Sequence, residues 1–264
     1  MADAGAIAGP AARGGARRRI PPWVAGLIGL AAVAAVLEVA VATGALPVLS
    51  VPAPSAVVQA AVRLVVHENL LAALGSTLAT SLVAVGAAIL VGLPAGYWLY
   101  RHTHFGLAYR NWLGALFAAP TVLLYPLVLV LFGRSYLAIA VMGFVTGIIP
   151  IVLGAREALV AVPVTLIRVG RAFNVTPTQE FWKILLPAGA PMIFTGIRLG
   201  TIYTLVNVIG VEFLVNFGGL GYLVSDMYDR FDFPGMYAGI LFVILVSGSM
   251  LALLKRIEAR LRPA

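Results

Sequence analysis

Long apolar stretches with few charges are the feature that most constrains the fold of this chain. Only 11% of its 264 residues are charged, and its mean hydropathy is +1.02, whereas soluble domains carry about a quarter charged residues. A helix needs about 20 mostly apolar residues to cross a bilayer. The sequence therefore predicts an all-α polytopic membrane protein with six spans, at residues 23–45, 70–99, 112–132, 135–154, 190–215 and 236–255.

The basic residues are unevenly distributed between the predicted loops. Fourteen Lys and Arg residues lie in the N-terminal tail, the loops 100–111 and 155–189, and the C-terminus. The other loops hold only Arg63, Arg134 and Arg230, and Arg198 lies within a span. By the positive-inside rule the basic segments are cytoplasmic, so both termini are expected there. The net charge of +8 thus orients the chain in the bilayer and does not indicate nucleic-acid binding.

The first apolar stretch raises the question of a signal peptide. The run from Trp23 to Leu46 is long enough to span, and no small-residue cleavage site follows it, so a signal-anchor helix is favoured. We expect a disordered basic cytoplasmic tail at 1–22, then a first span and an outer extended segment at 23–69. The core is expected at 70–256, with a second basic tail at 257–264.

The predicted cytoplasmic loop 155–189 carries signals for two short helices, the first over 166–173. Asn174 follows at a corner that needs a left-handed residue, a conformation that asparagine tolerates. Thr176, Pro177 and Gln179 form a capping-box pattern. A second helix is therefore predicted from about Pro177 to Leu185, ending before Pro187.

The second short helix carries two adjacent aromatic residues, Phe181 and Trp182, between Glu180 and Lys183. In one interpretation the helix is interfacial and its rings lie among lipid headgroups. In the other, the rings enter a groove on a cytoplasmic partner. The residues alone favour neither.

This loop resembles the coupling motif of binding-protein-dependent ABC transporter permeases, roughly Glu-Ala-Ala, three residues, Gly, nine residues and Ile-x-Leu-Pro. Ile184-Leu185-Leu186-Pro187 matches the end of the motif, so Asn174 stands at the glycine position and Arg168-Val169-Gly170 at Glu-Ala-Ala. The acid is missing, and asparagine can make the same turn as glycine. Further similarity to the nitrate/sulfonate/taurine branch covers about residues 70–256 and includes Pro120, Pro126, Pro191, Thr195-Gly196-Ile197-Arg198, Glu212-Phe213-Leu214 and Gly218-Gly219-Leu220-Gly221-Tyr222.

The resemblance implies a type I importer permease-like fold in the bacterial cytoplasmic (inner) membrane. It also implies import of a small, anionic solute such as a sulfonate, taurine or nitrate. The expected partners are two ABC ATPase subunits holding ATP and Mg, a second permease copy or homologue, an external substrate-binding protein, and membrane lipid. The residues expected to couple to the ATPase are Asn174, Thr176, Pro177, Glu180, Phe181, Trp182 and Lys183.

An ATPase site is not expected in this chain itself. A P-loop needs Gly-x-x-x-x-Gly-Lys-Ser/Thr, but the only lysines, Lys183 and Lys255, follow Trp182 and Leu254. We therefore expect no bound cofactor. His102 and His104, placed in a predicted loop without a third ligand, are weak evidence for a metal, so no metal site is expected either.

Polar residues within spans are functional candidates because burying them in lipid is costly. Tyr203, Thr204, Asn207 and Glu212 in the fifth span are expected to line the translocation pathway, although threonine also bonds to helix backbone and Glu212 could bond to the following glycine loop. That loop, with Gly218, Gly219 and Gly221, is expected to be irregular backbone at an outer gate, followed by a short amphipathic helix over 222–228 that folds back at the mouth of the pathway.

Two other classes compete with the ABC interpretation. A secondary transporter or channel would work without ATP, but the sequence has no convincing internal repeat and no acid–base pair at the midplane. A membrane enzyme would need a catalytic cluster, and no HExxH or Ser/His/Asp grouping is visible.

Overall fold

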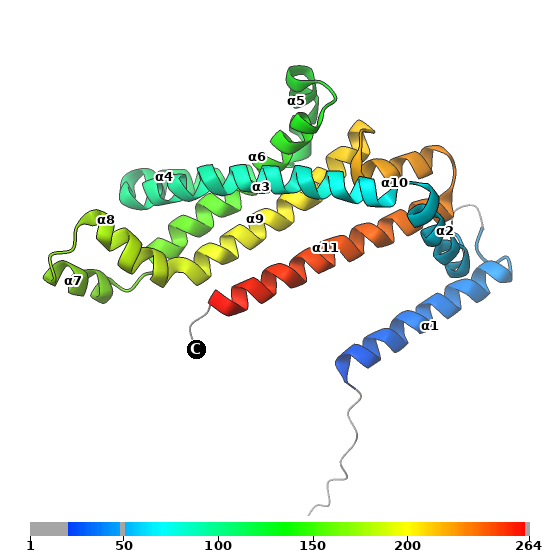
Figure 1. Cartoon of the computed structure of the whole chain (residues 1–264), viewed down its shortest axis with the longest axis horizontal. Coiled ribbons are helices and arrows are strands. Elements are labelled where there is room, and N and C mark those ends of the chain that lie inside the picture. Colours follow the sequence, from blue (N-terminus) through cyan, green and yellow to red (C-terminus); the bar gives the residue numbers. More distant parts are fainter. Residues whose placement is uncertain (1–20, 48–50, 262–264) are drawn as a thin grey trace, which may run out of the picture.

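The computed structural model describes residues 21–47 and 51–261, and every element in these ranges is helical (Figure 1). Five helices are long and apolar enough to cross a membrane, or six if one bent pair is counted as a span. This confirms the all-α polytopic class. The elements are α1 (Pro22–Ala42), α2 (Pro54–His67), α3 (Leu70–Arg101), α4 (Thr103–Ala118), η1 (Thr121–Leu124), α5 (Tyr125–Phe132), α6 (Tyr136–Val160), α7 (Val164–Ala172), α8 (Pro177–Glu180), η2 (Phe181–Leu185), α9 (Leu186–Val215), α10 (Gly219–Asp229) and α11 (Phe233–Leu261).

The centre of the bundle is built from α3, α6 and α9, which pack along one another. Small residues let the backbones approach closely, as is common between membrane helices. A Cβ atom on Gly154 of α6 would lie only 2.6 Å from the Cα atom of Gly196 on α9. The Thr204 hydroxyl donates to the Gly143 carbonyl at 3.1 Å, which adds a polar tie between these helices.

The third predicted span is broken. α4 and the following η1–α5 segment meet at an angle of 83°. Ala119 is extended, with ψ 140°, because the following Pro120 disfavours helical backbone before it. The prediction of one helix over 112–132 is therefore wrong. The loop predicted at 100–111 is also wrong, since α4 begins at Thr103 and includes His104.

The end of the bundle formed by α2 and α10 is more helical than predicted. α2 begins at Pro54, within the segment 46–63 expected to be extended, whereas α10 agrees with the short helix expected over 222–228. The Glu38 carboxylate accepts the Ser55 N–H at 3.0 Å and the Ser55 hydroxyl at 2.6 Å, which satisfies donors at the start of α2. Asn216 and Gly218 have positive φ, but α10 starts at Gly219, so Gly221 is helical.

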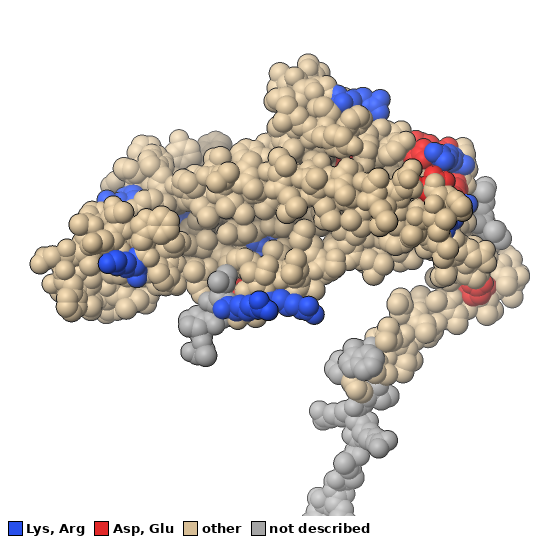
Figure 2. All heavy atoms as spheres, in the orientation of Figure 1, with Lys and Arg blue, Asp and Glu red and all other residues tan. Residues whose placement is uncertain are grey.

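The opposite end carries most of the described basic residues outside the spans. In Figure 2 the visible Asp and Glu side chains gather mainly around α2 and α10, away from the α7–α8 loop. We therefore take the α7–α8 end as cytoplasmic. α11 remains helical to Leu261, beyond the point where a tail was predicted, and Glu258 pairs with Arg198 at 3.2 Å. The tail predicted at 1–22 lies almost wholly outside the described residues.

Candidate functional site

The cytoplasmic loop is a compact pair of short helices, α7 and α8, joined at Asn174. Asn174 has φ 53°, as predicted from its tolerance of left-handed backbone. The predicted capping box is also present: the Gln179 N–H donates to the Thr176 hydroxyl at 3.3 Å, and the Thr176 N–H donates to the Gln179 side chain at 3.0 Å. These local contacts fix where the second helix begins.

The second helix does not end before Pro187, contrary to the prediction. It passes through the wide π-turn η2, in which the Leu186 N–H bonds to the Phe181 carbonyl five residues back, and continues as α9. Pro187 has no N–H and its ring crowds the carbonyl four residues back, so a wider turn lets the chain stay helical. The second helix of the loop, α8, and the fifth span are therefore one continuous helix.

Two residues predicted to contact the ATPase make contacts within this chain. Glu180 is buried and pairs with Arg171 of α7 at 3.3 Å. The ring of Phe181 packs against Tyr97 of α3, with centroids 4.5 Å apart. These contacts hold the two short helices together and seat them on the bundle.

The exposed apolar surface of the loop lies elsewhere. Phe173, just before the Asn174 corner, is 78% exposed, and Trp182 is 62% exposed. Val164 and Val169 of α7 are exposed too. Phe173 was not predicted from the sequence; its position just before the predicted corner at Asn174 was the available clue. Thr176, Pro177 and Lys183 are exposed on the same loop.

The predicted pathway residues of α9 separate into two groups. Tyr203 is 41% exposed and lies on the same face as Asn207, which is partly exposed. Thr204 and Glu212 are fully buried within the chain. Of the four residues, only the first pair is exposed at the surface of the described chain.

The bend of the broken span lies against this exposed face. Tyr203 meets the ring edge of Phe117 at a centroid distance of 4.7 Å. The Asn207 side-chain amide donates to the Thr121 hydroxyl at 3.4 Å, and Thr121 lies 3.2 Å from the Thr146 hydroxyl. Phe117 and Thr121 were not predicted as site residues; Pro120, which breaks the span beside them, was the available signal.

Glu212 and the glycines of α10 form one buried cluster. The Glu212 carboxylate accepts from the Gly221 N–H at 3.1 Å and from the Thr77 hydroxyl at 2.8 Å. Gly219 has φ 82°, and a Cβ there would overlap the Glu212 carboxylate. Gly218, at φ 58°, lies against Tyr136. The carboxylate thus holds α10 onto α9 and α3.

Comparison with known proteins assigns this architecture. Residues 88–263 match the model of the binding-protein-dependent transport system inner membrane component family. The chain belongs to this family. It is an ABC importer permease subunit.

Relatives in the family are named for different solutes. The chain is 29% identical over 186 residues to the osmoprotectant import permease protein OsmW of Salmonella typhimurium, covering 69% of this chain and 86% of OsmW. It is 31% identical over 157 residues to the glycine betaine/proline betaine permease protein ProW of Escherichia coli, covering 59% of this chain and 44% of ProW. The nitrate import permease protein NrtB of Synechocystis is 30% identical over 103 residues, covering 39% of this chain and 38% of NrtB.

Solved structures show the same fold. An inward-facing form of the MetNI methionine ABC transporter aligns with a TM-score of 0.65 at 21% identity, over 74% of this chain and 96% of that one. A second MetNI crystal form gives a TM-score of 0.63. The type I importer permease-like fold is confirmed.

Proposed function

We propose that this permease works in the bacterial cytoplasmic membrane, with a second copy or homologue, a pair of separate ABC ATPase subunits and an external substrate-binding protein. ATP and Mg are bound by the ATPase subunits, and this chain supplies no ATPase site of its own. The family and the MetNI-like fold support the kinds of partner.

The observation that carries this proposal is the continuous helix from Pro177 through η2 to Val215. It joins the cytoplasmic loop directly to the face of α9 that bears Tyr203 and Asn207. A displacement of the loop by the ATPase subunits therefore moves that face without an intervening flexible linker. Closure of the ATPase dimer on ATP draws the two loops together and changes access to the pathway.

The ATPase contact is proposed to be the exposed side of the loop, with Phe173 and Asn174 at its centre and Thr176 and Pro177 beside them. Trp182 and Lys183 are proposed to form its edge, next to the start of the fifth span. Exposed aromatic side chains are the usual anchors of protein interfaces. Glu180 and Phe181 support this surface from within.

The pathway is proposed to lie between the two permeases, on the side where Tyr203 and Asn207 meet the bend at Phe117 and Thr121. Thr204 and Glu212 act there indirectly, by fixing the packing of α9. Gly218, Gly219 and Gly221 place α10 at the outer end, as a gate beside the binding protein.

The transported solute is proposed to be small and anionic, such as a sulfonate, taurine or nitrate. The branch motifs and the similarity to NrtB support an anion. The similarity to OsmW supports an osmoprotectant as the competing class. Tyr203 and Asn207 are uncharged, so the binding protein is expected to supply most of the charge selectivity. Competition of nitrate, taurine and glycine betaine for uptake into cells expressing the whole system separates the two classes.

Co-purification of the tagged chain in mild detergent, with mass spectrometry, tests the ABC assignment and the contact surface together. An ATPase subunit is expected with the native chain and with Trp112→Ala, which removes a tryptophan on α4 that is more exposed than Trp182. It is expected to be lost with Phe173→Ala combined with Trp182→Ala. Retention in the double variant contradicts the contact surface. A native, folded chain without any ATPase favours an ATP-independent transporter or channel.

A further inference from the structure

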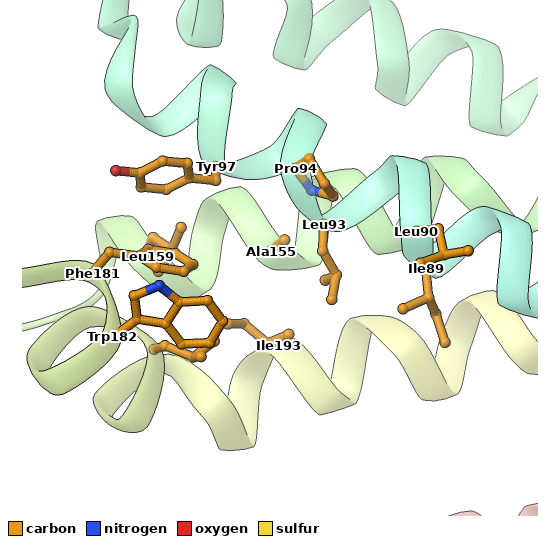
Figure 3. A pocket seen from close by; sticks show the side chains of 11 residues that line it. Ile89, Leu90, Leu93, Pro94, Tyr97, Ala155, Leu159, Phe181, Trp182 and Ile193 are labelled. Carbon is orange, nitrogen blue, oxygen red and sulfur yellow. The ribbon is translucent and has the colours of Figure 1, made fainter. Parts of the chain in front are cut away.

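An apolar groove of about 430 Å³ lies where the coupling loop joins the bundle. Figure 3 shows its side chains converging from α3, α6, η2 and α9. Tyr97 and Trp182 supply the only polar atoms among the lining side chains, which are otherwise aliphatic or phenyl. The lining residues that matter most below are Leu90, Leu93, Tyr97, Phe181 and Trp182.

The groove opens away from the bundle, toward the bilayer. Leu90 on its rim is 77% exposed, and Trp182 on the opposite rim is also exposed. Along α3 it extends from Ile89 to Tyr97, about 12 Å at 1.5 Å per residue. One leaflet of the hydrocarbon core is about 15 Å thick. The groove thus matches a lipid tail in length as well as in polarity.

Two exposed basic residues are close in sequence to residues that line the cytoplasmic end of this groove. Lys183 follows Trp182 and is exposed. Arg101 lies four residues beyond Tyr97 on α3, hence on the same face of that helix, and is exposed as well. The neighbouring acid, Glu180, is buried and paired with Arg171. The charge at the mouth of the groove is therefore positive.

We propose that one anionic phospholipid of the cytoplasmic leaflet occupies this site, with an acyl chain in the groove and its phosphate at Lys183 and Arg101. The tail then fills the space between α3 and the start of α9, beside the contact between Tyr97 and Phe181 that seats the loop. The lipid is an additional partner of the permease, located at the joint between the coupling loop and the fifth span.

Native mass spectrometry of the full chain tests this proposal without any ATPase. The chain is titrated with phosphatidylglycerol or phosphatidylcholine of identical acyl chains. One bound lipid is expected, with phosphatidylglycerol favoured. Lys183→Gln is expected to lower that preference about fivefold, the contribution of one basic residue near an anionic surface. Lys255→Gln, at the only other lysine, is expected to leave it unchanged.

A variant that fills the groove tests the contribution of the acyl chain to binding separately from that of the headgroup. Leu93→Trp is expected to reduce retention of both lipids at least tenfold, whereas Leu82→Trp, on the exposed outer part of α3, is expected to have no effect. In case Leu93→Trp fails to fold, quenching by brominated phosphatidylglycerol gives a second measurement: the native chain is expected to lose more fluorescence than Trp182→Phe. Equal retention of the two lipids by the native chain, or undiminished retention by folded Leu93→Trp, overturns the proposal.

A second copy of the chain is the competing occupant. Because the chain has no cysteine, Leu90→Cys introduces a single thiol at the rim. In vesicles containing phosphatidylglycerol, this variant is expected to form no disulfide-linked dimer under mild oxidation. Efficient disulfide-linked dimers show that protein covers the groove and overturn the lipid assignment.

Discussion

The carboxylate of Glu212 lies 2.8 Å from the hydroxyl of Thr77, although the two residues are 135 positions apart in the chain. The same hydroxyl accepts the Leu220 N–H at 2.8 Å, and the same carboxylate accepts the Gly221 N–H. Two buried side chains therefore join α3, α9 and the outer helix α10. Burial makes each of these groups costly to leave unpaired.

Removing the carboxylate is expected to destabilise the protein. Glu212→Ala leaves the Gly221 N–H and the Thr77 hydroxyl without this acceptor and should lower the unfolding free energy by about 1–3 kcal/mol. Glu212→Gln keeps an acceptor and should cost less. Thermal unfolding of the purified chain in detergent measures both, with Asp229→Asn on the exposed side of α10 as control. Equal losses in Ala and Gln variants would contradict the hydrogen-bonding role.

Gly219 and Gly210 should respond in opposite ways to a methyl group. Gly219→Ala combines φ 82° with overlap of Glu212, so a loss of roughly 1–2 kcal/mol or more is expected. A Cβ on Gly210 meets nothing within 4 Å, and alanine favours helix by about 1 kcal/mol. Thermal unfolding should therefore show a lower Tm for the first variant and an unchanged or higher Tm for the second. Similar Tm values for the two variants would show that α10 shifts easily to accommodate the methyl group.

The pair of Arg198 and Glu258 is expected to hold the cytoplasmic end of α11. Glu258 is buried and also accepts from the Thr195 hydroxyl at 3.1 Å. Arg198→Ala removes this ion pair from a buried carboxylate, at a cost of up to about 3 kcal/mol. Protease cleavage within 250–261 should become faster, while Arg256→Ala, an exposed neighbour, should leave the rate unchanged. Unchanged cleavage in Arg198→Ala would mean that other contacts hold α11.

The corner at Asn174 should tolerate glycine and reject valine. At φ 53° glycine is unstrained, whereas a β-branched side chain costs more than about 1 kcal/mol. Asn174→Gly is expected to retain the ATPase in co-purification, and Asn174→Val to lose it several-fold. Circular dichroism of both variants separates loss of docking from loss of fold. Full retention of the ATPase by Asn174→Val would show that the corner is not part of the proposed contact surface.

The capping box and the corner of the loop could be predicted from the sequence because the residues that form them are close together in the chain. Thr176 and Gln179 are three residues apart, and the conformation of Asn174 depends on its own side chain. The continuation through Pro187 was not readable, because a π-turn is not signalled by residue type. The bend at Pro120 was missed because the span was predicted from the length of its apolar run, without treating the proline as a break.

Long-range packing decided which predicted site residues are accessible. Phe181 and Trp182 are adjacent and chemically alike, yet Tyr97 of α3 covers one and leaves the other exposed. Glu212 was predicted both as a pathway residue and as a partner of the glycine loop, and the hydrogen bond to Gly221 is the part observed. Its bond to Thr77 has no sequence signal, because the two residues are 135 positions apart and nothing in either helix indicates that they meet.

The continuous helix from Pro177 to Val215 bends most easily near its cytoplasmic end. At 1.5 Å per residue, Pro177–Val215 is roughly 60 Å long, about twice the hydrocarbon thickness of a bilayer. The three features that weaken its hydrogen bonding, the π-turn, Pro187 and Pro191, all lie within 181–191. Bending there changes the angle of the remaining rod while preserving its length. A rotation of the rod by a few degrees about this bend therefore displaces its far end, where Glu212 holds α10, by ångströms.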